Sequence, residues 1–267
     1  MSTVLQLDHI VIAVHDLAQA IADYEALGFT VTPGGQHPGR TSHNALVVFA
    51  DGAYLELIAW QGPAPEERWW RDLQQHGEGL VDFALLPDDT VAVAEAARAR
   101  GLDVVPRDGA RRRPDGRELQ WQTARHATPD VPFLCGDITP REWRVPEGPV
   151  RTHANGATGV ASLSVAVADL EVTLQRYRAL LGPQADIGTP FVLTQSGVRL
   201  AQVQIGGTSL VLAERAGAAT AQGTLGRYLV ERGQGPCAFT LRSAAGQPAR
   251  SLEAALSHGA AIELLAG

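Results

Sequence analysis

Four glycines, each placed just after a stretch with helical periodicity, recur at nearly constant intervals along this chain. They are Gly28, Gly101, Gly182 and Gly259, which lie 73, 81 and 77 residues apart. Glycine often ends a helix because it adopts positive φ without a Cβ clash. Near-constant spacing in four successive units favours an internal repeat over four unrelated strand–helix units.

The first repeat predicts the order β-α-β-β-β. Asp16 is a typical helix N-cap, and an apolar stripe at helical spacing runs from Leu17 to Leu27. Asp51-Gly52 is a strong signal for a tight turn between two strands. The apolar, β-rich segments that we expect to form strands are residues 7–14, 29–31, 45–49 and 53–58.

The same order begins again three times. Asp88 or Asp89 is expected to cap the second helix and Asp169 the third, and the fourth unit has a strand at 237–241 with a helix through Leu252 and Leu256. Only eight residues follow Gly259, too few for three strands of about five residues each, so the fourth module is truncated.

These repeats predict an α+β fold of tandem βαβββ modules that form curved, half-open barrel sheets with helices outside. We expect one domain at residues 1–150, from modules one and two, and a second at 151–267, from module three and the truncated module four. The concave face of such a sheet is a natural pocket for a small molecule. The sheet edge left by the truncated module would suit a homodimer.

Composition narrows the function classes. The formal net charge is −7 and the pI about 5.6, so nucleic acid is not an expected partner. The run Arg111-Arg112-Arg113 is interpreted as a solvated loop rather than an anion site. The chain has two cysteines and no CxxC motif, no signal peptide and no apolar run of about 18 residues, so we expect a cytoplasmic protein without membrane contact. No phosphate loop or dinucleotide fingerprint occurs, so no nucleotide cofactor is expected.

Several motifs resemble the vicinal-oxygen-chelate (VOC) superfamily. Its modules open like Leu7-Asp8-His9-Ile10 and close like Tyr54-Leu55-Glu56-Leu57. The segments 34–46, 51–56 and 153–157 resemble, more narrowly, the glyoxalase-like domain proteins. The resemblance implies the fold of the glyoxalase/dihydroxybiphenyl dioxygenase type. It implies no single reaction, since the superfamily includes isomerases, epimerases, dioxygenases, lyases, transferases and metal-free drug-binding proteins.

The resemblance also implies a metal site. His9 on the first strand and Glu56 on the last would be ligands, and an imidazole with a carboxylate suits Fe²⁺, Mn²⁺, Ni²⁺ or Zn²⁺. Alignment of the modules places Val81, Ser162 and Val211 at positions equivalent to these two. None is a good ligand, so at most half of the symmetric set is present. A hydrogen-bonded histidine–glutamate pair that lines a pocket is the alternative.

Other side chains could complete or serve the site. A register slip of one residue would bring in Asp82, and His37, His43, Asp137 and His153 lie in loops or at strand ends. We expect His37 and His153 to move protons beside His9 and Glu56. The residues expected to bind the ligand are His43, Asn44, Trp143 and Asn155. Trp69-Trp70 and Trp121 are interpreted as packing or surface residues.

Three hypotheses follow. The first is a divalent-metal-dependent lyase, isomerase or dioxygenase that acts on a small oxygenated metabolite. The second is a metal-free protein that sequesters a small apolar or aromatic ligand in the same pocket. The third, which has less support, is metal-free acid–base catalysis by His9 and Glu56.

Overall fold

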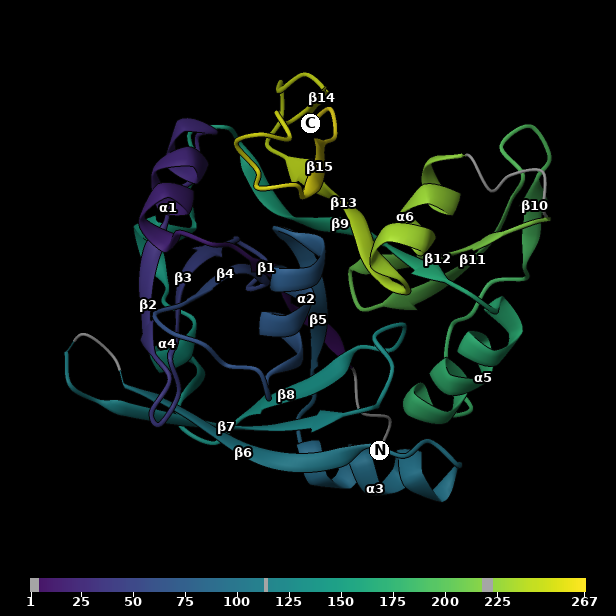
Figure 1. Cartoon of the computed structure of the whole chain (residues 1–267), viewed down its shortest axis with the longest axis horizontal. Coiled ribbons are helices and arrows are strands. Elements are labelled where there is room, and N and C mark those ends of the chain that lie inside the picture. The colour runs from purple at the N-terminus through teal and green to yellow at the C-terminus, as the bar shows by residue number, and fades with distance from the viewer. Residues whose placement is uncertain (1–4, 113–114, 218–222) are drawn as a thin grey trace.

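The computed structural model describes residues 5–112, 115–217 and 223–267, arranged as a β-barrel packed against a second, open sheet (Figure 1). The first module comprises β1 (Gln6–Ala13), α1 (Leu17–Ala26), β2 (Thr32–Gln36), β3 (Ser42–Val48) and β4 (Tyr54–Trp60). The second comprises β5 (Gly79–Leu86), α3 (Thr90–Ala99), β6 (Val105–Arg112), β7 (Glu118–Arg125) and β8 (Phe133–Asp137), and α2 (Arg68–His76) precedes it.

The barrel joins these two modules in the order β1-β4-β3-β2-β6-β7-β8-β5. Strands β1 and β5 pair antiparallel on one side, while β2 meets β6 on the other through the pair Gln36–Arg112. We predicted a half-open sheet, and this second contact closes it. Closure surrounds the concave face with strands.

The second sheet has the order β10-β11-β12-β9-β13-β15-β14. Its elements are β9 (Ala157–Val167), α5 (Leu170–Leu181), β10 (Phe191–Leu193), β11 (Val198–Ile205), β12 (Thr208–Arg215), α6 (Thr224–Arg232), β13 (Gly235–Ser243), β14 (Arg250–Ser251) and β15 (Ala261–Leu264). The connection between the sheets carries α4 (Arg141–Arg144) and the 3₁₀ turn η1 (Gly148–Arg151). Within the described ranges, no helix is long and apolar enough to cross a membrane.

The helix boundaries follow the predicted signals in the first three modules. The side chains of Asp16, Asp89 and Asp169 accept hydrogen bonds from the first turns of α1, α3 and α5. Gly28 and Gly182 follow α1 and α5 with φ of 86° and 85°. Module four differs, because residues 254–259 form turns and the helix predicted through Leu252 and Leu256 is wrong. Its single long return strand, β15, pairs parallel with β13.

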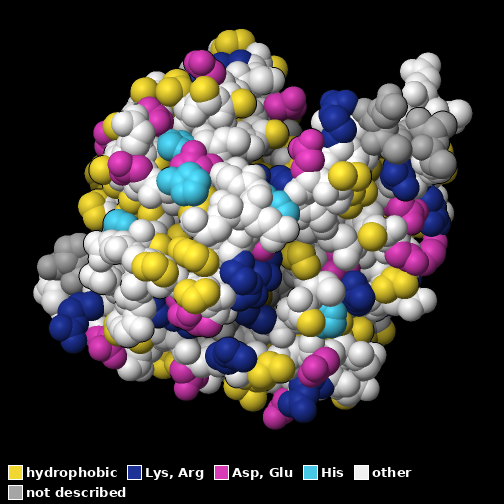
Figure 2. Space-filling view, in the orientation of Figure 1, with side chains coloured by type: hydrophobic (Ala, Val, Ile, Leu, Met, Phe, Trp, Pro, Cys, Tyr) yellow, Lys and Arg dark blue, Asp and Glu magenta, His cyan; other side chains and the backbone are white. Residues whose placement is uncertain are grey.

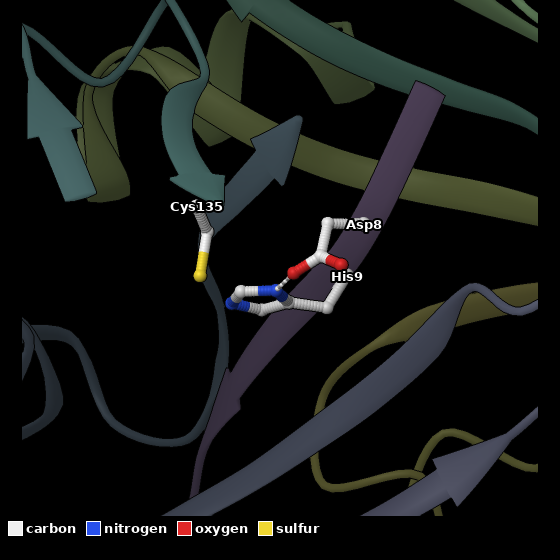
Figure 3. Close-up of side chains that lie close together, drawn as sticks. All are labelled: Asp8, His9 and Cys135. Carbon is white, nitrogen blue, oxygen red and sulfur yellow. Dashed lines mark hydrogen bonds and ion pairs between the residues drawn. The ribbon is translucent and has the colours of Figure 1, made fainter. Parts of the chain in front are cut away.

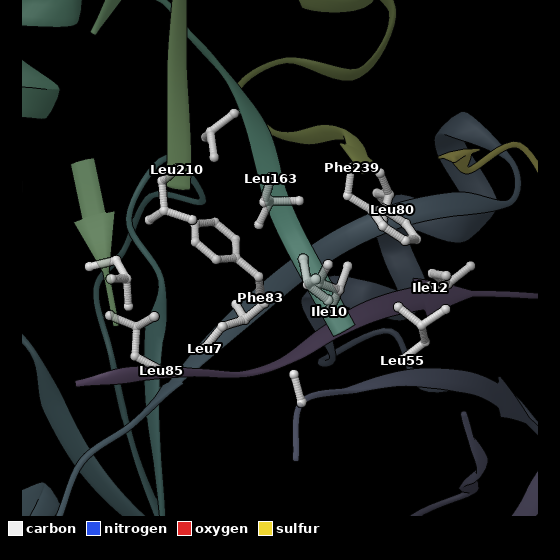
Figure 4. Close-up of a cluster of buried hydrophobic side chains, with 14 of the residues drawn as sticks. Leu7, Ile10, Ile12, Leu55, Leu80, Phe83, Leu85, Leu163, Leu210 and Phe239 are labelled. Carbon is white, nitrogen blue, oxygen red and sulfur yellow. The ribbon is translucent and has the colours of Figure 1, made fainter. Parts of the chain in front are cut away.

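One apolar core lies between the barrel and the second sheet. Outward-facing residues of the barrel, among them Leu7, Ile10 and Phe83, pack against Leu163 and Phe239 of the second sheet (Figure 4). Burying one such side chain contributes about 1.5–3 kcal/mol, so this shared core holds the two sheets together. At the surface, acidic and basic side chains are mixed over the face drawn in Figure 2.

Candidate active site inside the barrel

The barrel encloses a cavity of about 930 Å³. Its buried lining residues are His9, Ser42, Asn44, Leu46, Tyr54, Glu56, Ile58, Arg111, Thr123, Phe133, Cys135 and Arg144. A cavity of this size with a few convergent polar groups is typical of a small-molecule site.

His9 and Glu56 face one another inside this cavity. Parallel pairing of β1 with β4 sets His9 beside Tyr54 and Val11 beside Glu56, so alternate residues of both strands point inward. The distance from His9 Nε2 to Glu56 Oε2 is 3.5 Å, and both side chains are buried. The imidazole stacks on the Tyr54 ring with a centroid distance of 4.7 Å, which limits its rotation.

Asp8 orients the histidine from behind (Figure 3). The ladder between β1 and β5 shifts register between Leu7 and His9, and Asp8 lies at that irregularity, with its carboxylate 2.7 Å from His9 Nδ1. Arg144 binds both oxygens of this carboxylate, and Arg141 binds one. Burial alone would raise the pKa of Asp8, but the charge of Arg144 and the contact with His9 hold it well below its usual range. An ionised Asp8 can only accept a hydrogen bond, so His9 Nδ1 carries a proton and Nε2 is the ring nitrogen that faces Glu56.

Asn44 positions the glutamate. On β3 it lies next to β4, and its Nδ2 donates to Glu56 Oε1 at 2.5 Å. Among the described residues, Asn44 Oδ1 is a buried oxygen without a hydrogen-bond partner. A Cβ on Gly34 would lie 2.0 Å from this oxygen, so it faces the backbone of β2 and not the open cavity.

Cys135 extends from β8 toward His9 (Figure 3). Asp8, His9 and Cys135 offer ligand atoms within 4.8 Å of one another. Burial raises the pKa of Cys135 far above its usual value, so the sulfur stays a thiol. Since the Asp8 carboxylate is also bound by two guanidinium groups, this trio is a poor cation site.

His37 also reaches the cavity. Its Nδ1 lies 3.0 Å from Ser42 Oγ, and its ring meets Trp121 edge-on. Burial lowers the pKa of His37, with Arg111 adding to the effect and Glu56 opposing it. The imidazole is therefore neutral near pH 7 and able to accept a proton.

Two predicted ligand-binding residues point elsewhere. His43 lies between the inward-facing Ser42 and Asn44 on β3, so it faces outward, where the charge of Asp16 acts on it. Trp143 on α4 lies outside the cavity lining and packs against Arg117, whose guanidinium carbon is 5.4 Å from the ring centroid.

His153 and Asn155 hold the connection before β9 against the first module. His153 Nδ1 accepts from the backbone of Thr30, and its Nε2 contacts the carbonyl of Val48 at 3.0 Å. Asn155 Nδ2 donates to the carbonyl of Leu27 at the end of α1. Neither His153, expected to move protons, nor Asn155, expected to bind the ligand, lines the cavity.

Several residues that line the cavity were not predicted from the sequence. Arg111 and Arg112 belong to β6, and Arg111 is 4 % exposed, so their assignment to a solvated loop is wrong; Arg113 lies outside the described residues. Trp69 and Trp121 line the cavity as well. Alternate residues of the segment 105–112 face the cavity, and this alternation is the signal that could have predicted a strand. The proline, the glycine and the charged residues of the segment obscured it.

An irregularity in β5 sets the position of the Asp82 side chain. The β1–β5 ladder shifts register between Val11 and Ile12, where β5 skips from Asp82 to Leu80. The Asp82 carboxylate thereby contacts Arg125, Arg68 and Trp69, all of which line the cavity. Asp82 is thus a partner of arginines rather than a third ligand beside His9.

The second sheet repeats the strand pairing of the first module but carries other side chains at the positions of His9 and Glu56. Ser162 pairs with Ser209 as His9 pairs with Tyr54, and Val211 occupies the place of Glu56. This register agrees with the alignment of the modules made from the sequence. The second sheet therefore has no imidazole–carboxylate pair at these positions.

Comparisons with known proteins agree with this architecture. The family model described as the glyoxalase-like domain matches residues 7–181. The chain belongs to the glyoxalase-like domain family. No curated protein matches. The predicted VOC resemblance and the α+β fold class are confirmed.

Two solved structures illustrate the fold of this glyoxalase-like protein. A hypothetical protein from Staphylococcus aureus aligns with a TM-score of 0.74 at 14 % identity, over 98 % of this chain and 100 % of its own. A substituted form of 4-hydroxymandelate synthase from Streptomyces coelicolor aligns with a TM-score of 0.63 at 17 % identity, over 91 % of this chain and 71 % of its own. At these identities the likeness extends to the fold alone.

Proposed function

We propose that this glyoxalase-like protein is an enzyme that acts on a small oxygenated metabolite inside the barrel, as a divalent-metal-dependent lyase, isomerase or dioxygenase. The observation that carries the proposal is the pair His9 Nε2 and Glu56 Oε2, 3.5 Å apart in the cavity with the histidine oriented by Asp8.

The pair fits a divalent ion of the Fe, Mn, Ni or Zn class. Two ligands at about 2.1 Å from one ion and at a tetrahedral angle lie roughly 3.4 Å apart, close to the separation found here. A carboxylate behind the ligating histidine is the usual outer partner of such a site. His9 and Glu56 would hold the ion, which would polarise a substrate carbonyl or stabilise an enediolate.

The protein's own groups then have distinct tasks. Asp8 keeps a proton of His9 on Nδ1, and Asn44 holds Glu56 in place through its amide nitrogen. His37, neutral because burial lowers its pKa, accepts a proton from the substrate.

Metal analysis of protein purified without chelator tests the proposal. We expect about one bound ion per chain, lost in His9→Ala and in Glu56→Gln, and retained in His43→Ala, the outward-facing control. Absence of stoichiometric metal, together with no thermal stabilisation by added Fe²⁺, Mn²⁺, Ni²⁺ or Zn²⁺, would contradict it.

A metal-free binding protein is the second candidate, and a specific observation favours it. The strand of module two that corresponds to β4 brings the protonated thiol of Cys135 to the cavity instead of a carboxylate. In that case ligand-induced thermal stabilisation persists in chelator. Loss of the stabilisation on chelation would count against this candidate.

A further inference from the structure

The inner face of the β6–β7 ribbon is rich in arginine. Cross-strand pairs place Arg107 opposite Thr123 and Gly109 opposite Trp121, and both pairs line the cavity. Since alternate residues share a face, Arg111 and Arg125 belong to this inner surface too, and both line the cavity. We call the set Arg107, Arg111, Trp121 and Arg125 the arginine wall.

Arg107 and Trp121 lie on strands across the barrel from the His9–Glu56 pair, whereas the guanidinium of Arg125 reaches the Phe133 ring beside His9. In the cyclic order of eight strands, β6 and β7 are four places from β1 and β4. Four steps around an eight-stranded barrel reach its opposite side. A molecule in the cavity can therefore contact the arginine wall with one end and the His9–Glu56 pair with the other.

Trp121 gives the wall a flat aromatic surface. A Cβ on Gly109 would lie 2.5 Å from the indole, so the ring rests directly on the backbone of the neighbouring strand. His37 meets the Trp121 ring edge-on, with centroids 6.1 Å apart. An indole held flat in this way favours a planar ligand that stacks on it.

The guanidinium groups of the wall differ in their partners. Arg125 binds Asp82 at 2.9 Å and lies 3.6 Å over the Phe133 ring. Buried Arg111 donates to the carbonyl of Arg144 at 3.3 Å. Arg107 is exposed at the cavity, and the described part of the chain places no carboxylate in ion-pair contact with it. Arg107 is therefore the cation of the wall that an incoming anion can pair with.

We propose that the arginine wall selects planar, oxygenated anions, such as aromatic or enolic carboxylates, by pairing their negative group with Arg107 while their ring stacks on Trp121. The inference rests on the proposed function for the place of reaction, since it directs the substrate's other oxygens toward His9 and Glu56. Neutral analogues of the same shape lack the pairing and bind more weakly.

Salicylate and its neutral analogue salicylamide test this assignment. Calorimetric titrations in chelator are run on the wild type and on Arg107→Gln, with Arg112→Gln as the matched control. Arg112 is a second exposed arginine of the same strand and lies outside the cavity lining. We expect the wild type to prefer salicylate by about tenfold, consistent with one charge-assisted contact. Arg107→Gln should abolish the preference, and Arg112→Gln should keep it.

A second variant separates the stacking surface from the charge. Trp121→Leu should weaken both compounds equally. Equal affinity of the wild type for the two compounds, no saturable salicylate binding at millimolar concentration, or equal losses in the two arginine variants would each overturn the assignment. The titrations are repeated in His9→Ala, which lacks the proposed metal ligand. The preference for salicylate should persist in this variant, so ligand selection by the arginine wall is tested separately from the proposed reaction.

Discussion

Replacement of Asp8 by asparagine tests the charge network that supports the proposed site. The Asp8 side chain has no exposed surface and contacts His9, Arg141 and Arg144. Asparagine keeps the size of the side chain but removes its charge. Arg144, 4 % exposed, then keeps Asp137 as its only carboxylate partner among the described residues.

The expected cost is large because a buried cation loses a partner. Breaking a buried ion pair from one side typically costs about 3–5 kcal/mol, and an asparagine that still accepts one hydrogen bond places the loss near the lower limit, roughly 3 kcal/mol. The pKa of Asp8 lies well below its ordinary 3.8, so the carboxylate stays charged from pH 8 to pH 5. Its contribution is lost only as the pH falls below that ordinary value, and the deficit of the variant should be constant above pH 5.

Urea unfolding followed by tryptophan fluorescence measures the loss. Glu171→Gln is the control, because Glu171 pairs with Arg199 at the surface, where solvent screening leaves the pair little effect on stability. In a double-mutant cycle with Arg144→Met, the combined loss should be smaller than the sum of the single losses. A loss below about 1 kcal/mol for Asp8→Asn, or strict additivity with Arg144→Met, would refute the reasoning.

Three further predictions concern packing and protonation. Burial lowers the pKa of His153 from 6.5, so the unfolded chain takes up the proton first and the free energy of unfolding falls as the pH drops below 6.5, by up to about 1.4 kcal/mol per pH unit. His153→Gln should reduce that slope in urea unfolding between pH 7.5 and 5.5. An unchanged slope would speak against a buried, neutral His153. In Gly109→Ala the new Cβ would displace the Trp121 indole, so calorimetry should show severalfold weaker salicylate binding. Unchanged affinity would show that the ligand does not stack on Trp121. Asn155→Ala should cost roughly 1–2 kcal/mol in chemical denaturation, because the Leu27 carbonyl loses a donor and the Ala157 N–H loses an acceptor. A loss below measurement error would exclude these two bonds as stabilising contacts.

Much of the local structure could be predicted from the sequence. The caps Asp16 and Asp169 and the terminating Gly28 and Gly182 depend only on neighbouring residues, and the structure places each of them as predicted. Alternation along β1 and β4 separates His9 and Glu56 from the outward-facing Ile10 and Leu55, but both faces of these strands are buried, so packing against the second sheet decides which face lines the cavity.

The tertiary structure decided which other side chains share that cavity. Contact between β2 and β6 closes the barrel and brings the arginine wall opposite β1 and β4, although no short-range pattern links residues 36 and 112. Irregular pairing along β1 and β5 placed Asp8 and Asp82 beside arginines, against simple alternation. Pairings of distant segments depend on the fit of whole strands, which a local pattern does not encode. For the same reason, the sequence could not show that His153 and Asn155, predicted as site residues, bind the backbone of the first module and hold the connection between the two sheets.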